Sequence, residues 1–339
     1  MKKTVFFGAL TVAGLAAGMA SAATLDDVKA RGALNCGVTT GLVGFAAPDA
    51  NGVWKGFDVG VCRAVAAAIF GDPTAVEFVP TTGQTRFTAL ASGEIDLLAR
   101  NTTWTFSRDV DLKFEFIGVN YYDGQGFMVP KALGVSSAKE LDGATVCIQT
   151  GTTTELNLAD FFRTNNISYE PVPIETNAEA QQQYLAGACD VYTTDASGLA
   201  ATRATFENPG EHVLLPEIIS KEPLGPLVRH GDNEWGDIAR WTLNALIAAE
   251  ELGVTSANVA ELAAAPTDNP EINRLLGTEG ELGAMLGLEA NWAVNAIAAG
   301  GNYGELFEQN IGESTPIGLA RGLNAKWTEG GLIYTPPFR

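Results

Sequence analysis

Short apolar segments alternate with segments of helical periodicity along most of this chain, and the alternation occurs in two successive sets. In the first set, strands are predicted at 34–38, 76–80 and 95–99, with helices at 59–70 and 86–92. Strands that alternate with helices of this length are typical of a sheet covered by helices. The first set therefore predicts one sheet-based core.

The second set repeats these units further along the chain. Its predicted strands and helices lie at 126–129, 145–149, 151–164, 169–173, 178–186 and 189–193. Thr152 and Glu155 have the spacing of a capping box, which favours a helix start there. After residue 235 the sequence is mostly helical and rich in Ala and Leu. Together the two sets predict an α/β protein with two lobes, each a similar mixed sheet flanked by helices.

The chain is predicted to pass between the two lobes twice, near 122–126 and near 223–226, which gives a two-strand hinge. A chain of 339 residues is long enough for two cores. We predict that residues 23–125 form the first part of lobe one and that residues 126–224 form lobe two. Residues 225–339 are predicted to return to lobe one and to add a C-terminal helical extension.

The first 22 residues have the pattern of a Sec signal peptide. Lys2 and Lys3 precede an apolar stretch at 5–19, and Ala20-Ser21-Ala22 is an A-x-A cleavage site. The residue directly after the cleavage site is Ala23 and not Cys, which argues against a lipid anchor. We therefore expect cleavage near Ala22 and a periplasmic protein.

The charge balance excludes one large class of partner. The chain has 40 Asp and Glu against 21 Lys and Arg, a formal net charge of −19. Such an acidic chain has few Lys and Arg side chains that could release counterions from phosphates. We therefore expect no binding of nucleic acid. No later apolar stretch reaches the length of a membrane span, and we expect a soluble monomer.

Four cysteines in an oxidising compartment favour disulfides. Two lie early and two lie centrally, which favours the pairs Cys36–Cys62 and Cys147–Cys189. Buried free thiols stay an open alternative. The chain has no C-x-x-C motif and only two histidines, so we expect no metal site and no cofactor.

Polar residues follow predicted strands at three places. Asn101, Thr103 and Arg108 come after the strand at 95–99, Asp195 follows the strand at 189–193, and 150–154 opens a helix. A guanidinium pairs with both oxygens of a carboxylate, and free N–H groups at a helix start favour an anion. Asp195 offers an acceptor to an ammonium. These groups complement the two charged ends of a free α-amino acid.

Three ordered segments resemble one family. Residues 56–66 (GFDVGVCRAVA) are similar to the signature of the family 3 periplasmic solute-binding proteins of amino-acid ABC transporters, and 95–108 and 151–153 resemble its ligand-binding stretches. The segment 121–126 (YYDGQG) is similar to the general L-amino-acid-binding subgroup. The resemblance implies the type II periplasmic binding protein fold, a cleft that closes on a free L-amino acid, and delivery to an inner-membrane ABC permease.

Carried over by position, the resemblance implies a role for each site residue. Arg108 would bind the α-carboxylate, with Thr103 and a backbone N–H near Thr153. Asn101 and Asp195 would hold the α-ammonium. Further candidates are Arg100, Thr152, Arg86 and Thr39.

Side-chain specificity is less defined by the sequence. Many relatives have an Asp where Thr39 stands and aromatic residues where Leu42 and Gly83 stand. The missing Asp argues against a preference for Lys or Arg side chains, and the missing aromatic residues favour broad specificity. Arg100 and Arg86 could attract Glu or Asp. Two alternatives stay open, namely an enzyme on the same fold (a dehydratase or lyase using Asp195) and a sensory module that presents its ligand. We expect a binding protein and no enzyme.

Overall fold

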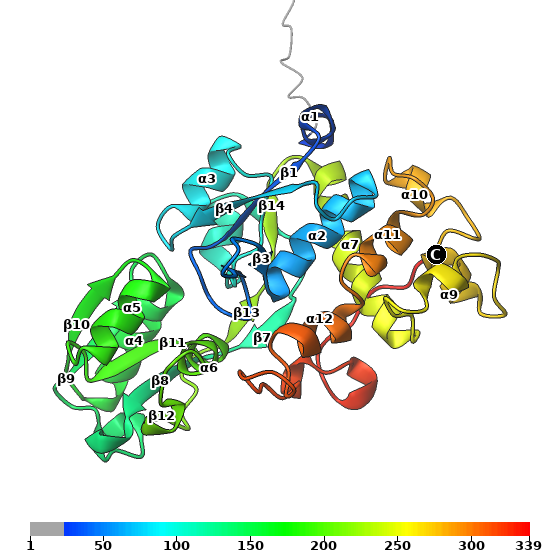
Figure 1. Cartoon of the computed structure of the whole chain (residues 1–339). Coiled ribbons are helices and arrows are strands. Elements are labelled where there is room, and N and C mark those ends of the chain that lie inside the picture. Colours follow the sequence, from blue (N-terminus) through cyan, green and yellow to red (C-terminus); the bar gives the residue numbers. More distant parts are fainter. Residues whose placement is uncertain (1–23) are drawn as a thin grey trace, which may run out of the picture.

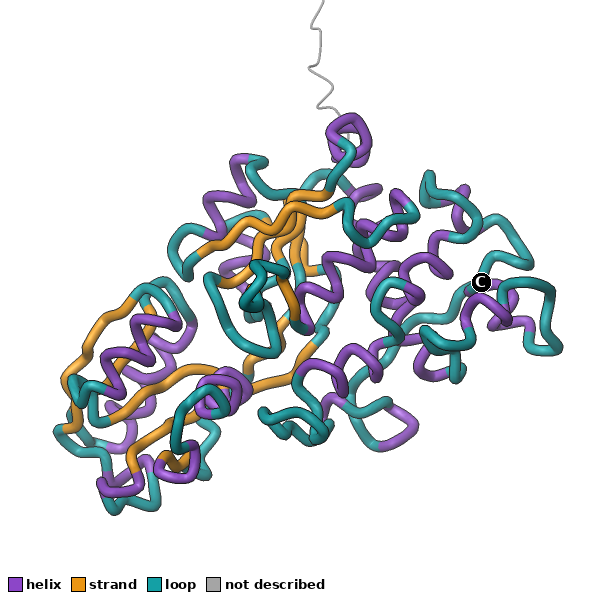
Figure 2. Tube along the Cα trace, viewed as in Figure 1, coloured by secondary structure: helices purple, strands orange, loops and turns teal. Residues whose placement is uncertain are grey.

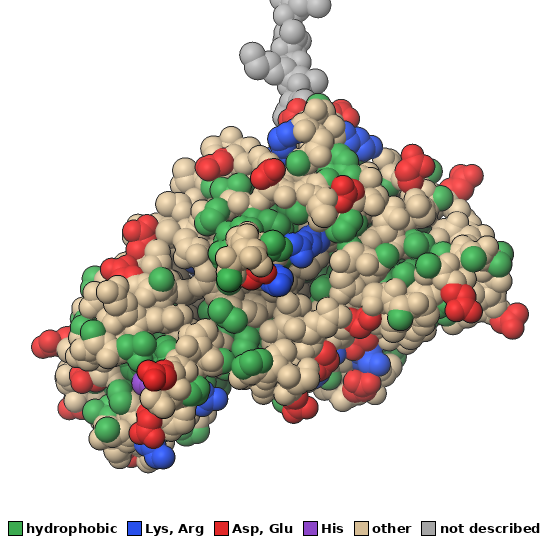
Figure 3. Space-filling model, in the orientation of Figure 1, with side chains coloured by type: hydrophobic (Ala, Val, Ile, Leu, Met, Phe, Trp, Pro, Cys, Tyr) green, Lys and Arg blue, Asp and Glu red, His purple; other side chains and the backbone are tan. Residues whose placement is uncertain are grey.

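The computed structural model describes residues 24–339, and the predicted signal peptide lies outside this range. The fold is built around two five-stranded sheets that are separated in space (Figure 1). Within the described residues, none of the helices is long and apolar enough to cross a membrane. Acidic side chains are scattered over the face shown in Figure 3.

The first sheet has the strand order β4-β1-β5-β14-β6. β1 pairs in parallel with β4 and β5, whereas β14 pairs antiparallel with β5 and β6, so the sheet is mixed as predicted. Helices α2 and α7 pack against each other and against this sheet, and α3 also packs on it. We call this sheet and its helices the first lobe. Its strands and helices are α1 (Thr24–Arg31), β1 (Leu34–Thr39), β2 (Ala47–Pro48), β3 (Trp54–Lys55), α2 (Phe57–Phe70), β4 (Val76–Thr81), α3 (Arg86–Ser92), β5 (Leu97–Leu98), β6 (Phe114–Phe116), β14 (Leu227–Arg229) and α7 (Asn233–Glu251).

The second sheet has the order β10-β9-β11-β8-β12 and is mixed in the same way. β9 pairs in parallel with β10 and β11, while β8 pairs antiparallel with β11 and β12. This sheet and its helices form the second lobe, at the lower left of Figure 2. Its elements are β8 (Gln125–Pro130), β9 (Ala144–Gln149), α4 (Thr153–Asn165), β10 (Tyr169–Ile174), α5 (Asn177–Leu185), β11 (Val191–Asp195), α6 (Ala196–Arg203) and β12 (His212–Leu214).

A third, two-stranded sheet joins the lobes. It consists of β7 (Tyr121–Asp123) and β13 (Glu222–Leu224), which pair antiparallel with Tyr122 opposite Pro223. These strands lie where the two chain crossings were predicted, and we call them the hinge pair. The lobe boundaries at 125/126 and 224/225 stay a prediction.

One predicted detail of the second lobe is wrong. The Thr152 side chain does not cap α4, because its hydroxyl donates to the Gln149 carbonyl at 2.7 Å. Glu155 instead accepts from the N–H of Gly151 at 2.8 Å. The helix begins where predicted, but without the reciprocal pair of a capping box.

The C-terminal region after α7 packs on the first lobe. α11 contacts both α2 and α7, and α12 contacts the same two helices, so this region shares the apolar core of that lobe. Further along, the Asn324 side chain accepts from the N–H of Tyr122 at 2.6 Å and donates to its carbonyl at 3.1 Å. The extension therefore holds one strand of the hinge pair. Its helices are α8 (Val259–Leu262), α9 (Pro270–Leu275), α10 (Leu282–Met285), α11 (Trp292–Ala298) and α12 (Tyr303–Asn310).

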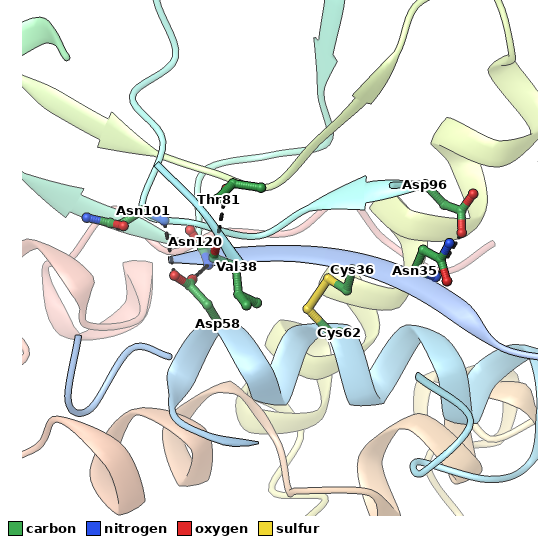
Figure 4. The surroundings of a disulfide bond; sticks show 9 residues. All are labelled: Asn35, Cys36, Val38, Asp58, Cys62, Thr81, Asp96, Asn101 and Asn120. Atoms are coloured by element: carbon green, nitrogen blue, oxygen red, sulfur yellow. Dashed lines mark hydrogen bonds between the residues drawn. A yellow bond between two sulfur atoms is a disulfide. The ribbon is translucent and has the colours of Figure 1, made fainter. Parts of the chain in front are cut away.

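Both predicted disulfides are confirmed. Cys36 of β1 is bonded to Cys62 of α2 (Figure 4), and Cys147 of β9 is bonded to Cys189, just before β11. Each bond lies within one lobe and joins an inner strand of that lobe's sheet to another part of its core.

Candidate functional site

A cavity of about 460 Å³, including its opening, lies between the two lobes. It is built at the carboxyl ends of β5, β9 and β11, where ligands of open α/β sheets usually bind. Side chains from both lobes form its wall, and most of them are polar or charged. The lining residues are Leu42, Arg86, Arg100, Asn101, Thr103, Gln149, Thr152, Thr153, Thr154, Asn177, Tyr192, Thr194, Asp195 and Gly198.

Seven of the nine sequence-predicted site residues line this cavity, and two do not. Arg108 is buried behind the wall, where its Nη1 donates to the Thr103 carbonyl at 2.9 Å and its guanidinium lies 5.1 Å from the ring centre of Phe87. Thr39 is also outside the lining, and its hydroxyl accepts from the Asn177 amide at 3.3 Å. The structure thus brings these residues into one region without placing Arg108 on the cavity surface.

Asn101 follows β5 in a left-handed backbone conformation, with φ of 30°. Its N–H donates to Asp58 Oδ2 at 3.0 Å, and Asp58, from the first turn of α2, also accepts from the Asn120 amide (Figure 4). The side-chain oxygen of Asn101 is buried and has no hydrogen-bond partner within residues 24–339. Asn101, which lines the cavity, therefore has an unused acceptor.

The first lobe contains three buried arginines, and two of them, Arg86 and Arg100, line the cavity. Arg100 donates to the Thr81 carbonyl at 3.1 Å, and Arg86 donates across the cleft to the Gly151 carbonyl at 3.2 Å. Burial, followed by repulsion from Arg108, lowers the pKa of Arg100 to about 10, and burial also lowers that of Arg86. Each guanidinium disfavours the charged form of its neighbours by repulsion. An anion bound among them would relieve this repulsion and would itself be stabilised.

The second lobe contributes one carboxylate to the cavity wall, that of Asp195. Burial, and then the neighbouring Asp123 and Glu222, raise the pKa of Asp195 well above its ordinary value. Burial likewise raises the pKa of Asp123 to about 6. A cation placed beside Asp195 would lower that pKa and be stabilised in return. The cavity wall thus offers guanidinium donors from the first lobe and a carboxylate from the second lobe.

Sequence reasoning missed two residues that hold the site together. Glu222, on hinge strand β13, accepts hydrogen bonds from Thr103 and from Thr153, which belong to different lobes. Asn177, at the start of α5, donates to the Gly41 carbonyl at 3.1 Å across the cleft. A polar residue that begins a helix after a predicted strand was a usable signal for Asn177. Glu222 stood in a segment where the pattern broke, so the sequence offered no comparable signal.

Several contacts join the lobes directly at the cleft. The Gln84 amide donates to the Thr150 hydroxyl at 3.0 Å, and the hydroxyl oxygens of Thr103 and Thr153 lie 3.4 Å apart. The two lobes are therefore closed on each other. Among residues 24–339, no group of three or more His, Cys, Asp or Glu side chains is arranged to hold a metal ion.

The chain belongs to the family described as bacterial extracellular solute-binding proteins, family 3, which matches residues 34–258. It is 69% identical to the glutamate/glutamine/aspartate/asparagine-binding protein BztA of Rhodobacter capsulatus over the full length of both chains. It is 59% identical, again over both full lengths, to the general L-amino acid-binding periplasmic protein AapJ of Rhizobium johnstonii.

Among solved structures, the chain is similar to an ABC transporter periplasmic binding protein from Brucella ovis with glutathione bound. That similarity has a TM-score of 0.91 at 57% identity, and it covers 94% of this chain and 100% of the other. The predicted family, fold class and periplasmic location are confirmed by these matches. The family match ends at residue 258, so most of the C-terminal extension lies beyond it.

Proposed function

We propose that this protein binds free L-amino acids in the cleft between its lobes and presents the closed form to an inner-membrane ABC permease. One observation carries the proposal, namely that a single cavity walled by both lobes is lined by the guanidinium donors Arg86 and Arg100 and by the acceptors Asp195 and Asn101. A zwitterionic α-amino acid carries a carboxylate and an ammonium close together, so it matches donors and acceptors at once. The proposed lobes are 23–125 with 225–339, and 126–224.

The α-carboxylate is assigned to Arg108 and the backbone near Thr153. Arg108 donates to the carbonyl of Thr103, which lines the cavity, so this assignment has Arg108 exchange that bond for one to a ligand oxygen. The α-ammonium is assigned to Asp195 and to the free oxygen of Asn101. Because these groups come from both lobes, the ligand stabilises the closed form over the open one.

The ligand side chain is assigned to the neighbourhood of Arg86 and Arg100. Both line the cavity, and the Nε of Arg86 is buried without a partner in the described chain. These donors suit the carboxylate or amide of glutamate, aspartate, glutamine and asparagine, the four amino acids in the name of the 69% identical relative. Broad specificity follows, since a guanidinium can donate to the oxygen of either group.

We propose carriage of the ligand without turnover, by a monomer. Asp195 sits where it can pair with the ammonium, which is a simpler role than acid or base chemistry on a carbon atom. Mass spectrometry of each amino acid after incubation with the protein tests this assignment. Unchanged amino acid is expected, and a dehydrated or cleaved product would contradict it.

A thermal-shift panel of the twenty L-amino acids, glutathione, simple polyamines and sugars tests the main proposal. A ligand with a Kd of about 1 μM, present at 1 mM, stabilises the native protein by about 4 kcal/mol. We expect upward shifts with acidic and amide amino acids above all. Glutathione is included because its γ-glutamyl part carries the same charged ends and a relative was solved with it bound. The absence of a shift with every amino acid would contradict the proposal.

A further inference from the structure

Glu222 connects both lobes at the cleft from its position on hinge strand β13. Its side chain is buried, with the residue only 1% exposed. One carboxylate oxygen, Oε2, accepts from the hydroxyl of Thr103 in the first lobe and from that of Thr153 in the second, the latter at 3.0 Å. The other oxygen, Oε1, accepts from the Asn157 amide at 2.7 Å and from the Ser220 hydroxyl at 2.6 Å. All four partners can act as donors.

These contacts decide which way the two threonine hydroxyls point. An ionised carboxylate can only accept hydrogen bonds, and each threonine has a single hydroxyl hydrogen. Thr103 and Thr153 therefore direct their hydrogens at Glu222. Both residues also line the cavity, so what their hydroxyls present to a ligand is lone pairs.

Lone pairs accept hydrogen bonds from an ammonium and offer nothing to a carboxylate. They lie in the cavity that also holds the free oxygen of Asn101 and the carboxylate of Asp195, which are acceptors too. Any part that Thr103 plays in a carboxylate clamp must then come from a backbone group.

We propose that Glu222 is a positioning residue that turns the hydroxyls of Thr103 and Thr153 into acceptors for the α-ammonium of the ligand. The two hydroxyls come from opposite lobes and meet at Glu222 in this closed form, so the proposed device couples ammonium recognition to closure. The inference rests on the proposed function and adds to it the group that sets the direction of these hydrogen bonds.

The variant Glu222→Gln tests this role by calorimetry with L-glutamate and with glutarate, which lacks the α-ammonium. Glutarate is measured by displacement where its binding is weak. The glutamine amide places a donor where the carboxylate only accepted, so one hydroxyl hydrogen is released toward the cavity. We expect the affinity for L-glutamate to fall at least tenfold and that for glutarate to change less than threefold. A residue that only supported the fold would weaken both ligands equally.

The matched control is Glu217→Gln. Glu217 accepts from the Ser137 hydroxyl at 2.6 Å and from the Ala138 N–H at 3.1 Å, and it does not line the cavity. We expect this variant to bind both ligands as the wild type does. If Glu222→Gln does not fold, Thr153→Val takes its place, with the same selective loss expected and with Thr153→Ser restoring binding.

Two outcomes overturn the inference: equal losses for both ligands, or unchanged binding of L-glutamate. If wild-type protein does not bind L-glutamate, the tightest amino acid of the thermal panel and its deaminated analogue replace the pair. Failure of the wild type to bind any amino acid overturns the proposed function itself, which separates the two failures.

Discussion

Two arginines of the site have different surroundings, and this predicts different effects when each is removed. Arg108 donates to the Thr103 carbonyl and does not line the cavity, whereas Arg100 lines it. A hydrogen bond to a charged group contributes about 1.5–3 kcal/mol, so losing a bidentate pair should lower affinity by a factor of about 100 or more.

We therefore expect Arg108→Ala to weaken every amino acid about 100-fold or more, because all of them share the α-carboxylate. Arg100→Ala should instead weaken glutamate and aspartate more than alanine or serine. Calorimetry with these four amino acids measures both effects. Unchanged affinity in Arg108→Ala would remove Arg108 from the site.

Asp58 shows how a buried group outside the cavity can shape it. Its carboxylate holds the N–H of Asn101, whose backbone is left-handed, and the amide of Asn120 (Figure 4). Burial raises the pKa of Asp58 from 3.8 to about 6, although both hydrogen bonds oppose the change. At neutral pH the buried Asp58 carboxylate is therefore charged, and this charge lowers the stability of the folded protein.

This pKa predicts a pH dependence of folding. Because the pKa is higher in the folded than in the unfolded state, the folded protein binds more protons between pH 4 and 6. The contribution of Asp58 to stability is therefore fully present below pH 4 and is lost as the pH rises through 6. A change of about two pKa units corresponds to about 3 kcal/mol.

The variant Asp58→Asn isolates this effect. We expect the wild type to lose up to about 3 kcal/mol of unfolding free energy relative to the variant between pH 4 and pH 8. Urea denaturation of both proteins at several pH values measures the difference. A difference that does not vary with pH would show that Asp58 does not titrate in this range.

At the scale of elements, periodicity predicted most of the fold because it reports which face of a segment is buried. The strands at 34–38 and 145–149 and the helix at 86–92 lie within a residue of β1, β9 and α3. β5 is an exception, since only Leu97 and Leu98 pair where 95–99 was predicted. Apolar character shows that Ile95 and Ala99 are buried, but not whether a partner strand runs alongside them.

The site was predicted less completely than the elements, for a physical reason. Asn101, Thr103 and Asp195 could be found because they directly follow strands, and strand ends meet at one edge of a sheet. Glu222 could not, since its partners Thr103 and Thr153 lie 119 and 69 residues away and meet it only in the folded chain. The capping box failed because the nearby Gln149 carbonyl takes the Thr152 hydroxyl.

The disulfides make a prediction at the same scale. They close loops with sequence separations of 26 and 42 residues, which in the chain-entropy account stabilises the fold by about 4 kcal/mol each. None of the four cysteines lines the cavity. We expect Cys147→Ala/Cys189→Ala to lower the unfolding free energy by several kcal/mol while amino-acid affinity changes less than threefold. A large loss of affinity in a folded variant would contradict this separation.

At the scale of the whole molecule, ligand capture depends on how closely the lobes approach. A Cβ added at Gly83 of the first lobe would lie 2.5 Å from the backbone oxygen of Thr150 in the second lobe. That distance is too short for non-bonded atoms, so a side chain at this position opposes closure but not folding.

Gly83→Ala should therefore lower amino-acid affinity at least tenfold while leaving the unfolding temperature of the ligand-free protein within a few degrees. The control is Gly210→Ala, where an added Cβ meets nothing within 4 Å, and wild-type affinity is expected. Small-angle scattering should show a smaller ligand-induced compaction in Gly83→Ala than in the control. Equal compaction and equal affinity would mean that the lobes do not close at this contact.

The most direct measurement compares three small ligands by calorimetry on protein freed of ligand by unfolding and refolding. L-glutamate carries both charged ends, glutarate lacks the α-ammonium, and 4-aminobutanoate lacks the α-carboxylate. Simultaneous recognition of both ends predicts that L-glutamate binds with micromolar affinity and at least 100-fold more tightly than either analogue. Equal binding of the three ligands would contradict this claim. So would a protein that binds neither these three ligands nor any other amino acid.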